Sequence, residues 1–168
     1  DWGKAVAHSG FGIVTFGIAA LLAWEVEDIR VVRAGETFEV GRYALTFAGV
    51  QQGSGPNFVS TIAKVDVVRN GRRIVTLTPE KRFYPVARMP TTEAAIHEGM
   101  FRDLYVVLGD EQGDGGWAVR TYVKPFANWI WAGCIIMALG GALSLSDRRH
   151  RVGVSARKTG HAISIPAE

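Results

Sequence analysis

The chain has 168 residues, 48% of them hydrophobic, and a formal net charge of +3 at pH 7. Its 19 basic residues are nearly balanced by 16 acidic ones, so we do not expect a nucleic-acid-binding protein. A single cysteine excludes an internal disulfide, and the fold must depend on its own packed core. Much of the hydrophobic content lies in two charge-free blocks, residues 5–24 and 126–145, which is typical of membrane spans.

The first block, AVAHSGFGIVTFGIAALLAW, is apolar on every face. About 20 residues at ~1.5 Å rise each can cross the hydrocarbon core of a bilayer, so we predict a transmembrane helix. The block is longer than the apolar core of a signal peptide, and no small-residue cleavage site precedes Trp24. We therefore expect the chain to retain it.

His8 is the one residue that does not fit this apolar description. An imidazole inside a span is costly unless it faces protein, water or a ligand, so a functional role is one hypothesis. The alternative is a histidine near the helix end that reaches the interface or bonds to a neighbouring helix, and the residues alone favour neither. Gly12 lies one turn along on the same face, where a small residue lets a helix or a flat macrocycle approach, which slightly favours a ligand site.

The region between the blocks alternates β-branched and aromatic runs with turn residues, a pattern that predicts strands. The expected strands cover residues 28–32, 36–40, 43–52, 58–69, 72–78, 104–108 and 117–123. Asn70 and Gly71 separate two of them and indicate a type I′ hairpin, because that turn needs positive φ at both central residues. We predict six or seven strands in a small antiparallel β-barrel or sandwich. For residues 91–99 we expect a short helix or a crossover.

The second block, FANWIWAGCIIMALGGALSL, predicts a second transmembrane helix. Asn128, Trp129 and Trp131 at its start are expected at the outer lipid–water interface. Close packing against another helix is expected on a face formed by three glycines, Gly133, Gly140 and Gly141. Cys134, in the same block, is expected to be a small packing residue.

Charges beside the two blocks predict the topology. The chain is acidic directly after the first block and rich in arginine after the second. Since positive charges near span ends stay in the cytoplasm, both termini are expected there and the middle region in the periplasm of a Gram-negative bacterium. The expected membrane α + β fold is therefore a transmembrane helix (1–25), a periplasmic β domain (26–125), a second transmembrane helix (126–146) and a basic, poorly ordered cytoplasmic tail (147–168).

Motifs of soluble catalysis do not stand out in the sequence. It has no phosphate-binding loop, zinc cluster or Ser/His/Asp constellation. Glu93 and His97, at i and i+4, would share one face of a helix, but a single such pair is too weak a pattern to predict a metal site. From the residues alone, His8 is the one residue for which the sequence indicates a chemical role.

Long motifs in the second half of the chain resemble the C-terminal end of the CcmF/NrfE family of bacterial cytochrome c haem lyases. They occur in family order, as TTEAAI (91–96), RDLYVVLG (102–109), WAVRTYVKPFANWIWAG (117–133) and MALGGALSLSDRR (137–149). The resemblance extends from Asp1 to about Arg149. One local departure is Ser9, where the family pattern has an aliphatic residue or glycine.

The resemblance implies that this segment is the last portion of a large polytopic inner-membrane protein. Such a protein holds haem b between two transmembrane histidines, and His8 stands where the second of them stands, with Gly12 packed closely beside the haem. The family's tryptophan-rich haem-handling segment and its periplasmic histidine pair lie upstream and are not in this chain. His97 matches no family ligand.

The implied function is attachment of haem to the CxxCH thiols of apocytochrome c on the periplasmic side. The implied partners are the remaining helices of the lyase, the haem chaperone CcmE, apocytochrome c with its presenting subunits of the CcmH/CcmI type, and membrane lipid. The isolated segment is expected to be inactive as an enzyme, because it supplies one haem ligand of two. The alternative is a membrane-anchored periplasmic binding module that docks assembly partners without ligating haem.

Overall fold

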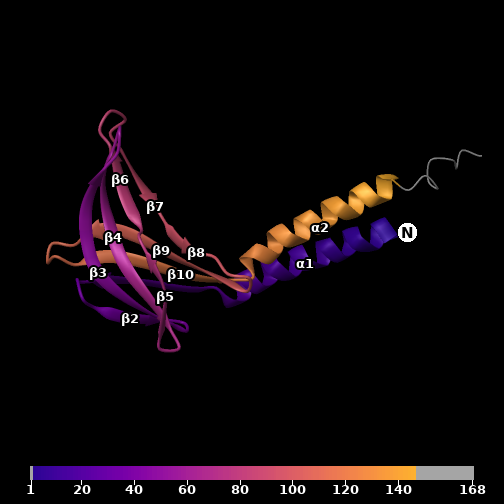
Figure 1. Cartoon of the computed structure of the whole chain (residues 1–168), viewed down its shortest axis with the longest axis horizontal. Helices are drawn as coiled ribbons and strands as arrows, with labels where there is room; N and C mark the ends of the chain where they lie inside the picture. The colour runs from indigo at the N-terminus through magenta and orange to yellow at the C-terminus, as the bar shows by residue number, and fades with distance from the viewer. Residues whose placement is uncertain (1, 147–168) are drawn as a thin grey trace, which may run out of the picture.

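The computed structural model describes residues 2–146 and shows a helical hairpin joined end-on to a β domain (Figure 1). Helices α1 (Trp2–Trp24) and α2 (Ala127–Ser146) run antiparallel, side by side, away from one end of the domain. Both are long and apolar enough to cross a membrane, and only 17% and 11% of their most apolar stretches is buried. The predicted cytoplasmic tail lies outside the described residues.

Glycines form the contact between the two helices. Gly3, Gly10 and Gly17 are spaced by seven residues along α1, close to two helical turns, and therefore share one face. Gly133 and Gly140 have the same spacing on α2, and all five glycines are buried. A Cβ atom on Gly10 would lie 2.7 Å from the carbonyl oxygen of Gly133. The predicted packing role is confirmed for Gly133 and Gly140, whereas Gly141 faces away from α1 and a Cβ there would meet no atom within 4 Å.

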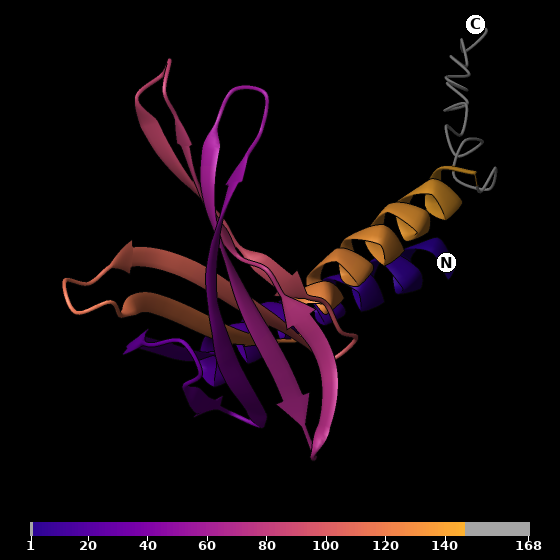
Figure 2. The same cartoon turned by 60° about the vertical axis from the view of Figure 1, so that its left-hand side comes forward.

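Two antiparallel sheets form the β domain, which confirms the predicted sandwich (Figure 2). The four-stranded sheet has the order β1 (Val26–Val32), β10 (Trp117–Pro125), β9 (Arg102–Glu111) and β8 (Ala95–His97). The six-stranded sheet has the order β2 (Thr37–Val40), β3 (Tyr43–Ser54), β4 (Val59–Arg69), β6 (Glu80–Tyr84) and β7 (Met89–Glu93), and β5 (Arg72–Leu77) pairs with β4. In Figure 2 the long β3–β4 hairpin crosses the β9–β10 hairpin steeply.

Alternate residues of the long strands fill the space between the sheets. Leu45 and Phe47 of β3 and Val65 of β4 face Leu104 and Leu108 of β9, all at most 1% exposed. This alternation is what a half-buried strand requires, since successive side chains point to opposite faces. Burial of each such aliphatic or aromatic side chain contributes about 1.5–3 kcal/mol, so a disulfide is not needed to hold the sandwich.

The β4–β5 hairpin confirms the predicted turn. Asn70 has φ of 51° and Gly71 has φ of 72°, the two positive values of a type I′ turn. Of the two alternatives for residues 91–99, the short helix is wrong and the crossover is confirmed, because the segment is extended and passes from one sheet to the other, with β7 pairing to β6 and β8 to β9. The described chain accordingly has ten strands and not six or seven.

Hydrogen bonds fasten the loop between β8 and β9 to the first turn of α2. The Nδ2 of Asn128 donates to the Gly99 carbonyl oxygen and to Oδ1 of Asp103, both at 3.0 Å. The Trp129 ring nitrogen donates to the Met100 carbonyl oxygen at 2.9 Å. The polar groups of Asn128 and Trp129 thus bind the protein's own loop, whereas the Trp131 side chain is 71% exposed, as an interfacial residue would be.

Replacing Asn128 with alanine is expected to weaken this junction. Asp103 is 3% exposed, and it would keep only the Gly99 backbone donor at 2.9 Å. A buried carboxylate that loses a donor costs about 1–3 kcal/mol. The unfolding midpoint of the full-length protein should fall, whereas Asn57→Ala, at an exposed position of the β3–β4 loop, should leave it unchanged. Equal midpoints would contradict a structural role for this contact.

Candidate functional site

His8 lies on a face of α1 that does not contact α2, and its side chain is exposed. Its Nδ1 is 2.8 Å from the carbonyl oxygen of Lys4, one turn earlier. A carbonyl oxygen can only accept, so Nδ1 donates, and in the neutral ring the lone pair is on Nε2. A ring held in this way presents Nε2 as a metal ligand, the usual arrangement of histidines that bind metals.

Gly12 lies beside His8 and leaves open space on the same face. A Cβ atom placed on Gly12 would meet no atom within 4 Å, whereas one on Gly10 would lie 2.6 Å from the backbone nitrogen of Met137. Helix α1 therefore has two distinct faces, one packed on α2 and one that carries His8 and Gly12. The His8 side chain is exposed and its hydrogen bond is to Lys4 of its own helix, so α2 is not the neighbouring helix to which the alternative hypothesis would bond it.

Residues 2–146 hold no cluster of three or more His, Cys, Asp or Glu side chains that could bind a metal ion. Glu93 and His97 lie on strands of different sheets, so the helical pairing considered from the sequence is wrong. The exposed face of α1 offers one imidazole, at His8, and one gap between side chains, at Gly12, which is what a single helix can contribute to a haem site.

A cavity of about 650 Å³ lies where the helices meet the β domain. We call it the junction cavity. Its apolar wall includes Trp24 at the end of α1, Phe101, and Phe126 just before α2. Its basic wall comes from the β domain and consists of Arg42, Arg69, His97 and Arg102.

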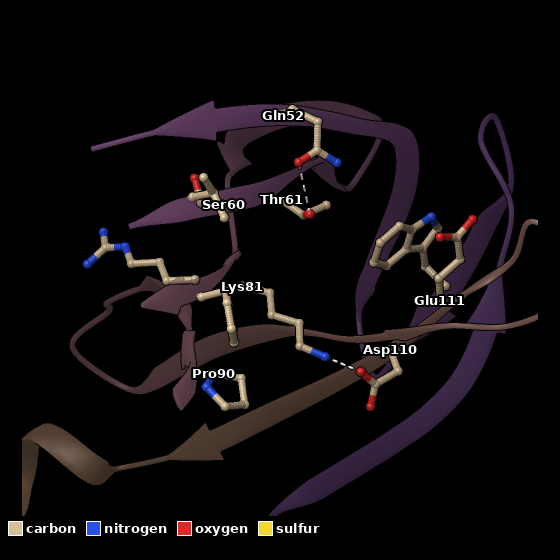
Figure 3. A pocket seen from close by; sticks show the side chains of 11 residues that line it. Gln52, Ser60, Thr61, Lys81, Pro90, Asp110 and Glu111 are labelled. Atoms are coloured by element: carbon tan, nitrogen blue, oxygen red, sulfur yellow. Dashed lines mark hydrogen bonds and ion pairs between the residues drawn. The ribbon is translucent and has the colours of Figure 1, made fainter. Parts of the chain in front are cut away.

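A smaller cavity of about 300 Å³ lies between the sheets at Gln52, Lys81 and Asp110 (Figure 3). Lys81 of β6 forms an ion pair with Asp110 of β9, which ties the two sheets together. The Arg82 guanidinium donates to Glu80 at 2.9 Å and lowers the pKa of that carboxyl below its ordinary value. Lys81 and Arg82 of this cavity thus already have partners, which makes it a weaker candidate for binding an ion.

Comparison with known proteins matches residues 23–125 to the model described as the CcmF C-terminal beta-sandwich. The chain belongs to this CcmF family. Among its relatives, the cytochrome c-type biogenesis protein ccl1 of Rhodobacter capsulatus is 56% identical over all of this chain and 26% of its own length. The cytochrome c-type biogenesis protein CcmF of Escherichia coli is 45% identical over 94% of this chain and 24% of its own length. The chain thus spans about a quarter of these relatives.

A solved structure described as cytochrome c heme lyase CcmF has the same fold as this CcmF segment. It superposes with a TM-score of 0.69 over 86% of this chain and 24% of its own, at 24% sequence identity. The match includes more than the sandwich, since the β domain alone is a smaller share of the chain. The solved structure therefore shares the fold of the helical hairpin as well as that of the β-sandwich.

The sequence did not indicate the junction cavity of this CcmF segment. Arg42 is in the turn after β2, Arg69 ends β4 and Arg102 begins β9, so the three are far apart in the chain. No spacing rule connects them, because their meeting depends on how the two sheets pack. The one available signal was that each arginine lies within two residues of the end of a predicted strand.

Proposed function

We propose that this chain is the C-terminal part of a haem lyase that attaches haem to the CxxCH thiols of apocytochrome c. In this proposal His8 supplies one axial ligand to a b-type haem within the membrane. The observation that carries it is an imidazole on the free face of an apolar helix, with Nδ1 bonded to the Lys4 carbonyl oxygen at 2.8 Å. The relatives named as cytochrome c-type biogenesis proteins support the general role.

Each residue of this face has a definite task in the proposal. The hydrogen bond from Nδ1 to Lys4 fixes the tautomer and limits rotation of the His8 ring, which keeps Nε2 directed away from the helix. Gly12 leaves room for the flat macrocycle. A bound haem supplies one-electron redox chemistry, and the surrounding apolar helices tune its potential. The second ligand comes from helices outside this chain.

The remaining features follow from the same proposal. The two helices cross the bacterial inner membrane, the β domain lies in the periplasm and the tail in the cytoplasm, as the charges flanking the spans predict. The β-sandwich forms part of the docking surface for the haem chaperone CcmE, or for apocytochrome c and its CcmH/CcmI-type presenting subunits. The packed hydrophobic core and the hydrogen-bonded strands make the β-sandwich a rigid support for such a surface.

The isolated chain is expected to form no thioether bonds between haem and apocytochrome c, because it holds one ligand where two are needed. The full-length protein, reconstituted with the same haem source and reduced apocytochrome, is expected to form them. Covalent haem is measured on denaturing gels by its peroxidase activity and by the mass of the product. Thioether formation by the isolated chain would contradict the proposal that the reaction needs a second haem ligand from helices outside this chain.

An anchored binding module is the second candidate function. It is favoured by apolar side chains on the outer face of the four-stranded sheet, where Ile29 and Val31 are 57% and 50% exposed. Apolar residues exposed side by side on one face of a strand can form part of a patch that contacts another protein. In this alternative the spans only anchor the domain, so haem content would not depend on His8.

A further inference from the structure

The junction cavity lies at the boundary between the apolar hairpin and the water-exposed domain. Trp24 is the last residue of α1, Phe126 directly precedes α2, and both line the cavity. Figure 1 shows the helices leaving the β domain at this end. With both helices across the membrane, which is part of the proposed function, the cavity opens at the depth of the lipid headgroups.

Three guanidinium groups and one imidazole line the cavity, and none of its lining residues is acidic. Within the described residues, Arg42, Arg69 and Arg102 form no ion pair with a carboxylate. Arginines elsewhere in the domain do form such pairs, namely Arg30, Arg33, Arg73, Arg82 and Arg120. The cavity therefore concentrates positive charge that the described part of the chain leaves without a counter-charge.

Arg69 gives an independent indication of a ligand. Its Nε is buried and has no hydrogen-bond partner among the described residues, although its Cζ lies 5.8 Å from the centre of the Tyr43 ring. Buried donors in proteins are almost always paired, and an unpaired one on a charged group is costly. An acceptor supplied by a bound molecule would satisfy it.

The apolar wall indicates what kind of molecule carries this acceptor. Trp24, Phe101 and Phe126 lie on the side from which the helices leave, and the Phe101 and Phe126 rings meet at 6.2 Å between centroids. A free phosphate ion would leave this wall without a partner. An amphiphile contacts both walls, with an oxyanion head against the arginines and an apolar body against the aromatic side chains.

We propose that the junction cavity binds an anionic membrane phospholipid, with its phosphate between Arg42, Arg69 and Arg102. The acyl chains pass the aromatic wall and continue along the helices. A net negative headgroup such as phosphatidylglycerol is preferred to a zwitterionic one, because three cations without a counter-anion surround the phosphate. The lipid would hold the β domain at a fixed height above the bilayer.

The test uses full-length protein in nanodiscs and counts retained lipid by native mass spectrometry after release into detergent. Phosphatidylglycerol should be retained in preference to phosphatidylcholine. The variant Arg42→Gln/Arg69→Gln/Arg102→Gln should bind phosphatidylglycerol more weakly by on the order of 100-fold. The control Lys64→Gln/Arg72→Gln/Arg88→Gln removes the same charge from exposed residues outside the cavity and should retain the lipid.

A single substitution keeps the test valid should the triple variant fail to fold. Arg42 is exposed in a turn, so Arg42→Gln should preserve the fold by circular dichroism and still weaken lipid binding about fivefold. Equal retention by the cavity and control variants would overturn the proposal. Displacement of the lipid by millimolar inorganic phosphate would overturn the lipid assignment and indicate a site for free anions. Haem content is measured in parallel, so a failure of the proposed haem ligation by His8 is distinguished from a failure of the proposed lipid binding in the junction cavity.

Discussion

Replacement of His8 with alanine in the full-length protein is expected to remove the b-type haem absorption or reduce it by on the order of tenfold or more. The reason is that His8 carries the one imidazole on the described helices, on the face that α2 leaves free. An iron that loses one of two axial imidazoles loses both affinity and its low-spin spectrum. The measurement is the reduced-minus-oxidised absorption spectrum, scaled to haem per protein.

Ser9→Ala is the matched control for this substitution. Ser9 is the next residue on α1, it is also exposed, and its hydroxyl donates to the Ala5 carbonyl oxygen at 2.9 Å, one turn earlier. Its removal changes the helix at the same depth without touching the imidazole, so haem content should stay at the wild-type level. Full haem content in His8→Ala would refute axial ligation and would favour the anchored binding module.

The features that the sequence predicted well are those decided by local composition. A run of about 20 residues without charge has few alternatives to a helix in an apolar environment, and α1 and α2 end within a few residues of the predicted blocks. The turn at Asn70 and Gly71 was predictable for a similar reason, because few residue pairs tolerate two positive φ values.

Strands β6, β7 and β8 were not predictable because partners distant in sequence decide them. Residues 91–99 contain TTEAA, which has no alternation of apolar and polar residues, and alanine and glutamate favour helices. In the fold, its first part, β7, pairs with β6 in one sheet, and its later part, β8, pairs with β9 in the other. The backbone hydrogen bonds of two sheets outweigh a weak local preference.

The candidate site was predictable in part. The sequence identified His8 as unusual in its surroundings, but the hydrogen bond to Lys4 and the direction of its face depend on the helix and its partner. The sequence also could not tell which glycines meet α2. Gly10 and Gly12 are two residues apart and look equivalent in the sequence, yet a Cβ on Gly10 would clash and one on Gly12 would not.

Replacing Gly140 with alanine is expected to destabilise the helical hairpin strongly. The new Cβ would lie 2.8 Å from the Cα and 2.9 Å from the Cβ of Ala7 on α1, closer than atoms of this kind can pack. Backbone atoms of a helix cannot rotate away, so the helices must separate and lose contact along their length. Overpacking of this kind costs about 1–3 kcal/mol, seen as a lower unfolding midpoint of the full-length protein in detergent.

Gly141→Ala isolates the effect of this contact. Gly141 is the next residue on the same helix, and a Cβ there would meet no atom within 4 Å of the described chain. Both substitutions raise helix propensity by the same amount, so the difference between their midpoints reports the contact with α1 alone. A midpoint for Gly140→Ala equal to that of Gly141→Ala would show that the helices do not approach as closely as the glycine spacing of seven residues indicates.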